Sequence, residues 1–257
     1  MKESRHPLTI YFFKFVLLSM VFLPSLAKSQ NNSLNFQHLT IENGLSDNAV
    51  NCITQDNEGY IWIGTEFGLN KYNAYSSKIF HPDKLDSDLN GTSRIICAFR
   101  DQKGRLWFGG NGLILCYPKE EKFIKYQFEK DNPNSLNHND VFSIIEDEFN
   151  DIWIGTRLGL AKYNESTNSF TRFMHDTIGT ATEVHGRNRI IDMFADSRGS
   201  LWMTTLMGIY QFSLKKHTFK EFLLNKKQRN SHNANQCTFM TLDKNGSIWV
   251  NFYAQGI

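Results

Sequence analysis

The chain has 257 residues, 40% hydrophobic and 21% charged, an ordinary globular composition that suits one large domain or two small ones. Its formal net charge of +2 is carried by the N-terminal segment, where Lys2, Arg5 and Lys14 stand against Glu3. The rest of the chain is neutral on balance and has no basic stripe, which excludes nucleic acid as a partner of this segment.

Residues 1–27 have the pattern of a secretory signal peptide. Basic residues precede an apolar run from Phe15 to Leu23 and a small-residue cleavage site that ends at Ala27. A buried N-terminal helix or a membrane anchor is the alternative. It is disfavoured because a spanning helix needs roughly 20 apolar residues and Lys14 interrupts this run. We therefore expect an exported protein whose mature part is 28–257.

After a polar segment at 29–39, the first repeat of the chain predicts four short strands. Val50 and Cys52 alternate with polar residues, as in a strand, and a turn follows at 56–59. Residues 60–65 show no polar alternation, which predicts a strand buried on both faces. Further strands are expected at 69–72 and 77–80, with Lys78 at a solvated edge.

This repeat occurs five times, each copy placing a tryptophan six residues after an aspartate. The tryptophans lie 45, 46, 49 and 47 residues apart. A period of about 40–50 residues marks a propeller or a solenoid. We predict an all-β propeller of four-stranded antiparallel blades, four complete and a fifth partial. The repeat positions are Asp56, Asp101, Asp147, Asp196 and Asp243 with Trp62, Trp107, Trp153, Trp202 and Trp249.

Some copies depart from this pattern. Asn150 replaces the turn glycine, and asparagine is a residue that tolerates positive φ. Thr204 and Asn251 replace the glycine of the doubly buried strand, so we expect the fourth and fifth blades to pack less closely there. The crossover at 176–188 is long and is expected to be a special loop. No helix is expected outside the signal peptide.

The cysteines and the turn aspartates do not indicate a metal site. Cys52 and Cys97 each lie four residues before a repeat aspartate, so they occupy one position in consecutive blades. That position is too far from its neighbour for the Cα separation below about 7 Å that a disulfide needs. The four cysteines are expected to be small buried thiols. The aspartates lack the alternating oxygen ligands of a calcium loop, and no catalytic motif is present. We expect no catalytic residues, metal or cofactor.

The repeats resemble the two-component regulator propeller family, whose core is Asp-x-x-Gly-x-Ile/Leu-Trp-Ile/Val-Gly-Thr and whose repeats start with a Gly-Leu-Ser or Asn-Ser-Leu segment. The best matches are 44–50, 56–72, 134–141 and 147–163. The resemblance implies the periplasmic sensor region of a hybrid histidine kinase of the inner membrane, which binds an oligosaccharide. This chain would then be an N-terminal fragment without the kinase. Its implied partners are the ligand, the remaining blades and downstream domains, and a second copy of the parent protein.

Ligand contacts are expected on connecting loops, because loops carry function on a rigid scaffold. The tryptophans invite a sugar-stacking interpretation, but their mid-strand positions favour core packing. The candidate contact residues, chosen for aromatic or hydrogen-bonding side chains, are Tyr75, His81, Asn111, Tyr117, His175, His185 and Arg187. A polysaccharide lyase or glycosidase, which would need converging acid and base groups, and a non-catalytic interaction propeller remain the alternatives.

Overall fold

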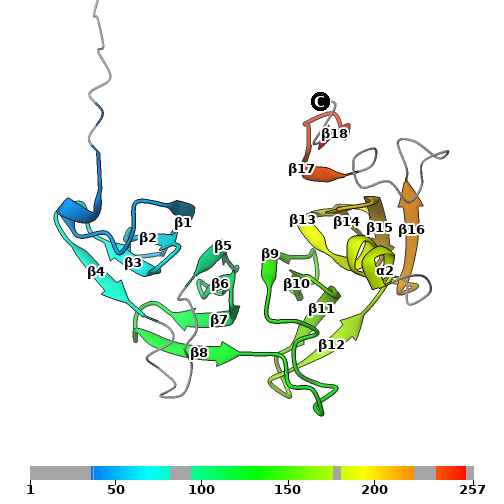
Figure 1. The fold of residues 1–257 in the computed structure, drawn as a ribbon, viewed down its shortest axis with the longest axis horizontal. Coiled ribbons are helices and arrows are strands. Elements are labelled where there is room, and N and C mark those ends of the chain that lie inside the picture. The colour runs from blue at the N-terminus through cyan, green and yellow to red at the C-terminus, as the bar shows by residue number, and fades with distance from the viewer. Residues whose placement is uncertain (1–35, 37, 82–93, 176–180, 223–235, 253–257) are drawn as a thin grey trace, which may run out of the picture. The chain divides into compact units, whose positions relative to one another are not determined.

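Strands dominate the computed structural model, which describes residues 36, 38–81, 94–175, 181–222 and 236–252 (Figure 1). The expected signal peptide lies outside these residues. Leu39–Ile257 forms one unit, and the description below concerns that unit alone. The described strands form antiparallel sheets in which each strand pairs with the next one along the chain.

Four sheets have four strands and a fifth has two. The first sheet contains β1 (Val50–Gln55), β2 (Ile61–Thr65), β3 (Gly68–Tyr72) and β4 (Ser77–Phe80). The second contains β5 (Ile95–Arg100), β6 (Leu106–Gly110), β7 (Gly112–Tyr117) and β8 (Lys122–Tyr126). The third contains β9 (Val141–Glu146), β10 (Ile152–Thr156), β11 (Gly159–Asn164) and β12 (Ser169–Phe173). The fourth contains β13 (Ile190–Asp196), β14 (Ser200–Thr205), β15 (Gly208–Ser213) and β16 (Thr218–Phe222). The fifth contains β17 (Cys237–Leu242) and β18 (Ile248–Phe252).

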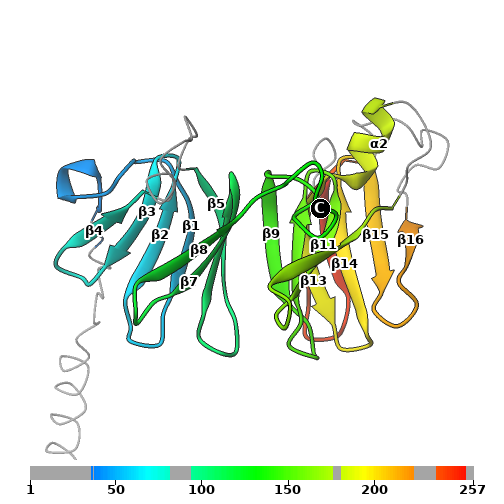
Figure 2. The same cartoon turned by 90° about the horizontal axis from the view of Figure 1, so that it is seen from below.

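The sheets are the blades of a β-propeller, which confirms the predicted fold class. The first strand of each blade packs beside the first strand of the next, from β1 through β5, β9 and β13 to β17. Since successive strands run antiparallel, alternate turns of a blade lie at the same end of its strands (Figure 2). One end carries the turns with the repeat aspartates, and we call it the aspartate-turn face. The other end carries the start of each first strand and the end of each fourth strand, and we call it the crossover face.

The repeat aspartate joins its turn to the blade core. Asp56 Oδ1 accepts backbone N–H groups from Glu58 at 3.0 Å and Tyr60 at 2.9 Å, which closes the turn. Asp56 Oδ2 accepts the indole N–H of Trp62 at 2.8 Å. The four other copies make the same indole bond at 2.8–3.1 Å. The predicted turns are confirmed, with Gly59 at φ 91° and Asn150 at φ 64°. The indole bond was not foreseen.

Adjacent blades meet where the second strand carries glycine. A Cβ added to Gly64 would lie 2.5 Å from Ile95 Cγ2, because Ile95 begins the first strand of the next blade. The same clash would occur between Gly109 and Val141 at 2.5 Å, and between Gly155 and Ile190 at 2.6 Å. Each of these three interfaces therefore packs a β-branched side chain against a glycine.

The fourth and fifth blades carry different residue types at these two positions. Thr204 occupies the glycine position of β14, and the next blade begins with Cys237 in place of isoleucine or valine. Both side chains are fully buried. Both positions are therefore closed to solvent, and the looser packing expected at Thr204 stays a prediction.

The crossover between the third and fourth blades contains a helix, so the prediction of no helix was wrong. The helix is α2 (Ala181–Asn188). Asn188 holds its end: the Asn188 side chain donates to the Val184 carbonyl at 2.9 Å and accepts the His175 backbone N–H at 2.8 Å. The segment has no apolar periodicity to reveal a helix, and this contact with the chain just beyond β12 anchors it. A short 3-10 turn at Ile41–Asn43 was also not predicted.

Candidate functional site

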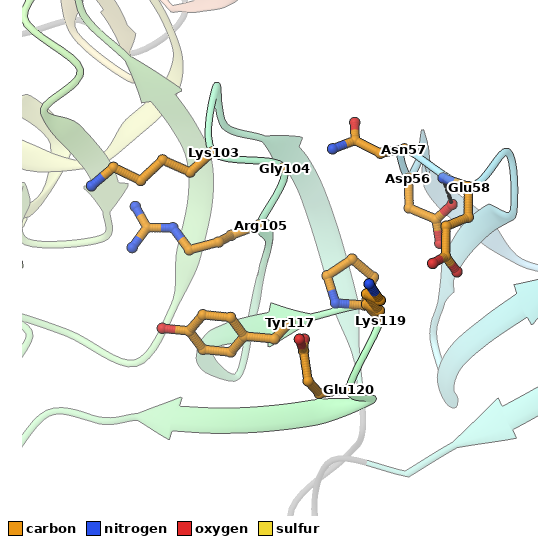
Figure 3. Close-up of a pocket in the computed structure, with 10 residues that line it drawn as sticks. Asp56, Asn57, Glu58, Lys103, Gly104, Arg105, Tyr117, Lys119 and Glu120 are labelled. Carbon is orange, nitrogen blue, oxygen red and sulfur yellow. Dashed lines mark hydrogen bonds between the residues drawn. The ribbon is translucent and has the colours of Figure 1, made fainter.

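A pocket of about 280 Å³ lies on the aspartate-turn face, between the first and second blades (Figure 3). Three turns contribute to it: the β1–β2 turn of the first blade, and the β5–β6 and β7–β8 turns of the second. We call it the Tyr117 pocket. Its lining residues are Asp56, Asn57, Glu58, Lys103, Gly104, Arg105, Tyr117, Pro118, Lys119 and Glu120.

Arg105 is a buried cation of this pocket. Its Nε donates to Asp101 Oδ2 at 2.6 Å, and its Nη1 donates to Glu165 Oε1 of the third blade at 2.9 Å. Burial lowers the pKa of Arg105, but Asp101, Glu165 and Tyr117 outweigh it and leave the pKa raised. Arg105 is thus a fixed cation held between two blades.

Tyr117 is a tyrosine that the other repeats do not have at the same position. Its neighbour Cys116 takes the place of Tyr72 and Tyr163, and Tyr117 stands one residue further on, where the other blades have polar residues. Figure 3 shows the side chains of Arg105, just before β6, and Tyr117, at the end of β7, projecting in the same direction, away from Asp56, Asn57 and Glu58. The ring therefore lies beside a fixed positive charge.

The rim of the pocket offers groups of both signs. Glu58, Lys119 and Glu120 are exposed. Lys103 also lines the pocket, and its Nζ lies 2.6 Å from Glu165 Oε2. Donors and acceptors around an aromatic ring can bind a polar ligand in a defined orientation. The described part of the chain contains no group of three or more His, Cys, Asp or Glu side chains that could hold a metal ion.

An equivalent pocket of about 200 Å³ lies between the second and third blades. It has the same position in the repeat and shares Arg105, but its tyrosine, Tyr163, is buried and donates to Asn168 at 2.9 Å. The groove is therefore a product of blade stacking. The side chains that line it differ from one junction to the next.

The crossover face carries a polar network around Asp140. His138 Nδ1 accepts the Asp140 backbone N–H at 2.8 Å, and Arg157 Nη1 lies 3.3 Å from Asp140 Oδ2. Burial lowers the pKa of His138, which outweighs the opposing effect of the Asp140 carboxylate, while Arg157 and His185 lower it further. Asn111 joins this network through its β-bridge with Asp140.

The structure does not bring the seven predicted contact residues together. Tyr117 lines the pocket, and Tyr75 lies on the same face in the β3–β4 turn, where it is 96% exposed. The other five belong to the crossover face. His81 follows β4, Asn111 connects β6 with β7, His175 follows β12, and His185 and Arg187 lie on α2.

Two of these residues serve packing. The His175 ring lies 4.1 Å from the ring of Tyr210, and Arg187 is buried. Sequence reasoning also missed Arg105 and Glu165, which form the charged contact between blades. The sequence does distinguish Arg105 from its equivalents, because the first and third repeats have Tyr60 and Asp151 at the same position.

Three comparisons relate this chain to known proteins. Residues 44–67, 88–112 and 135–157 match the model of the two component regulator propeller family. Histidine kinase P4 of Formosa agariphila is 37% identical over 73 residues, which are 28% of this chain and 5% of that protein. The extracellular domain of the hybrid two component system BT3049 from B. thetaiotaomicron superposes with a TM-score of 0.68 at 25% identity. That match covers 83% of this chain and 29% of the other.

A catalytically inactive virginiamycin B lyase from Staphylococcus aureus superposes with a TM-score of 0.60 at 14% identity, covering 84% of this chain and 67% of that chain. At this identity the likeness shows the propeller fold alone. The chain spans less than a third of either relative from a two component system. The chain therefore carries two component regulator propeller repeats at residues 44–67, 88–112 and 135–157. It is homologous to the extracellular domain of a hybrid two component system.

Proposed function

We propose that this chain is part of the periplasmic ligand-sensing propeller of a membrane-anchored histidine kinase, and that the ligand is an oligosaccharide. The observation that carries the proposal is the likeness to an extracellular two component system domain over 83% of the chain. Export by the N-terminal segment 1–27 is part of this proposal. The described residues include no helix with the length and apolar character to cross a bilayer.

The Tyr117 pocket is our proposed contact site for the sugar. It combines a tyrosine ring with carboxylate, ammonium and amide groups on three turns. A sugar presents an apolar ring face and many hydroxyl groups, so an aromatic surface ringed by donors and acceptors matches its chemistry. The pocket holds about 280 Å³, a size that suits one sugar unit of a longer ligand.

Signalling from this site would proceed by binding, without chemistry on the ligand. The pocket lies between two blades that are also joined by the ion pair of Lys71 with Glu121 at 3.3 Å. A ligand that contacts both blades favours receptor states with this spacing. It can shift their populations only by its differential affinity for them.

Calorimetric titration of the exported protein with neutral and acidic oligosaccharides tests the proposal. The Tyr117→Ala variant should weaken binding of an active sugar by at least about tenfold, which corresponds to 1.4 kcal/mol. Tyr75→Ala is the matched control, because Tyr75 lies on the same face but outside the pocket, and it should bind as the unmodified protein does.

Two results would count against the proposal in different ways. If no oligosaccharide in the panel binds the protein, the sensing of sugars is refuted. If a sugar binds and Tyr117→Ala leaves the affinity unchanged, the ligand is right but the pocket is wrong, and the polar network around Asp140 becomes the next site to mutate.

A further inference from the structure

An ion pair joins the first and second blades on the crossover face. Arg94, the residue before β5, places its Nε 3.0 Å from Oε2 of Glu66, the residue after β2. Glu66 also accepts the side-chain amide of Asn51, on β1, at 2.9 Å. The hydrogen bond from Asn51 and the charge of Arg94 hold the pKa of Glu66 below its ordinary value. One carboxylate therefore satisfies donors from both blades at this junction.

The equivalent junction between the third and fourth blades carries two arginines. Arg157 follows β10 as Glu66 follows β2, and Arg189 precedes β13 as Arg94 precedes β5. The backbone confirms the equivalence, because the Arg157 N–H donates to a carbonyl at the start of its own blade, that of Asp140, at 3.0 Å, and the Glu66 N–H makes the same contact in the first blade. Two like charges thus stand at positions that elsewhere form an ion pair.

A single carboxylate accompanies these two guanidinium groups. Asp140 Oδ2 lies 3.3 Å from Arg157 Nη1, and the Arg157 side chain remains 49% exposed. Among the described residues Arg189 has no acidic partner, and its buried Nε has no hydrogen-bond partner. The Arg189 guanidinium lies over the ring of Phe142, with Cζ 4.7 Å from the ring centroid. The ring fixes the cation in place but supplies no countercharge.

Two histidines border the arginines. His138 Nδ1 lies 3.8 Å from Asp140 Oδ2. Burial lowers the pKa of His138, and the charges of Arg157 and His185 lower it further, so His185 of α2 lies within electrostatic reach of this cluster. His185 is exposed and offers a further ring nitrogen at the surface. Donors therefore outnumber the one carboxylate among the described residues of this junction.

We propose that Arg157 and Arg189 bind an oxyanion of an external ligand, either a carboxylate or a sulfate group. The oxyanion takes the place at this junction that the Glu66 carboxylate has between the first and second blades. Guanidinium groups suit such ligands because their N–H donors pair with two oxygens at once, and stacking on an aromatic ring orients the donors before binding. The site lies on the face opposite the Tyr117 pocket and does not require that pocket to bind a sugar.

Titration of the exported protein with sodium sulfate and with sodium D-glucuronate tests the proposal. The NMR signals of the arginine Nε–H groups report binding, and sodium chloride keeps the ionic strength constant because salt screens exposed charges. The Arg189 signal should shift and saturate. Arg189→Gln and Arg157→Gln should each weaken binding by at least about tenfold. The matched control is Arg94→Gln, which removes the equivalent arginine that Glu66 already pairs, and it should bind as the unmodified protein does.

The possible outcomes separate the two oxyanions and the general effect of charge. Saturation by only one of the two salts supports the site and identifies the oxyanion that it takes. Shifts that grow without saturation in both titrations would overturn the proposal. Equal weakening in Arg94→Gln and Arg189→Gln would also overturn it, because net charge alone would then explain the binding. Arg157→Gln keeps the test decisive if Arg189→Gln fails to fold, since half of the Arg157 side chain is in solvent.

Discussion

Exchanging the sizes of Gly155 and Ile190, which meet between the third and fourth blades, is the sharpest test of how these blades stack. Gly155→Thr and Ile190→Cys together place, between the third and fourth blades, the residue types that Thr204 and Cys237 supply at the equivalent positions between the fourth and fifth. Each change alone should destabilise the protein, and the two together should restore most of the loss.

The structure sets the expected magnitudes. A Cβ on Gly155 would lie 2.6 Å from Ile190 Cγ2 and 3.2 Å from Ile190 Cβ, so Gly155→Thr overpacks the interface and should cost about 1–3 kcal/mol. Ile190→Cys removes methyl groups from a buried site and should cost about 1–3 kcal/mol. The added hydroxyl has a partner within reach, because in the fourth blade Thr204 Oγ1 accepts the Asp192 N–H at 3.2 Å and Ser143 is the equivalent of Asp192.

Urea unfolding followed by tryptophan fluorescence measures all four proteins of the cycle. We expect a favourable coupling energy of about 1–3 kcal/mol, so that the double variant is more stable than Gly155→Thr alone. The control is Ile190→Val, which removes a single carbon and keeps the β-branch that a Cβ on Gly155 would meet, and so should rescue Gly155→Thr far less than Ile190→Cys does. If the two single effects add to within about 0.5 kcal/mol, the idea that the sizes of residues 155 and 190 must match is refuted.

Three further predictions concern the core, the ion pairs and the thiols. Trp153→Ala should cost about 3–5 kcal/mol of unfolding free energy in urea melts, while Trp249→Ala should cost far less because Trp249 is 54% exposed; equal costs would contradict this. The hydrogen bond from Lys78 lowers the pKa of Glu121. The ion pair should therefore stabilise the folded protein above pH 4.5, the ordinary pKa of glutamate, and this stabilisation should be lost as the pH falls further. The Lys78→Met variant should not show this loss. Burial raises the pKa of the Cys52 thiol to about 12, so the folded protein should label with maleimide at pH 8 far more slowly than the unfolded chain.

Local features of the sequence were enough to predict the blade. The aspartate and glycine of each turn, the doubly apolar second strand and the position of the third and fourth strands depend on contacts within a few residues. In the first repeat the expected strand at 77–80 coincides with β4. The steady period of the repeats then predicted a propeller, because similar sheets can bury their apolar faces only by packing against one another.

The candidate site could not be predicted from local sequence features in the same way. Of the seven predicted contact residues only Tyr117 lines a described pocket, and its neighbour Arg105 was missed. Arg105 meets Glu165 across two blades, 60 residues apart in the chain. No periodic pattern carries information about which side chains face each other over such a distance.

The sequence by itself thus determined the repeating unit, its turns and its buried strand, since these follow from backbone hydrogen bonds and local burial. Only the tertiary structure showed that the turn aspartate binds the indole of its own blade, that Gly64 seats Ile95 of the next blade, and that Asn188 anchors a helix in the crossover. These contacts depend on how neighbouring blades and loops approach in space, and the packing of whole blades fixes that approach.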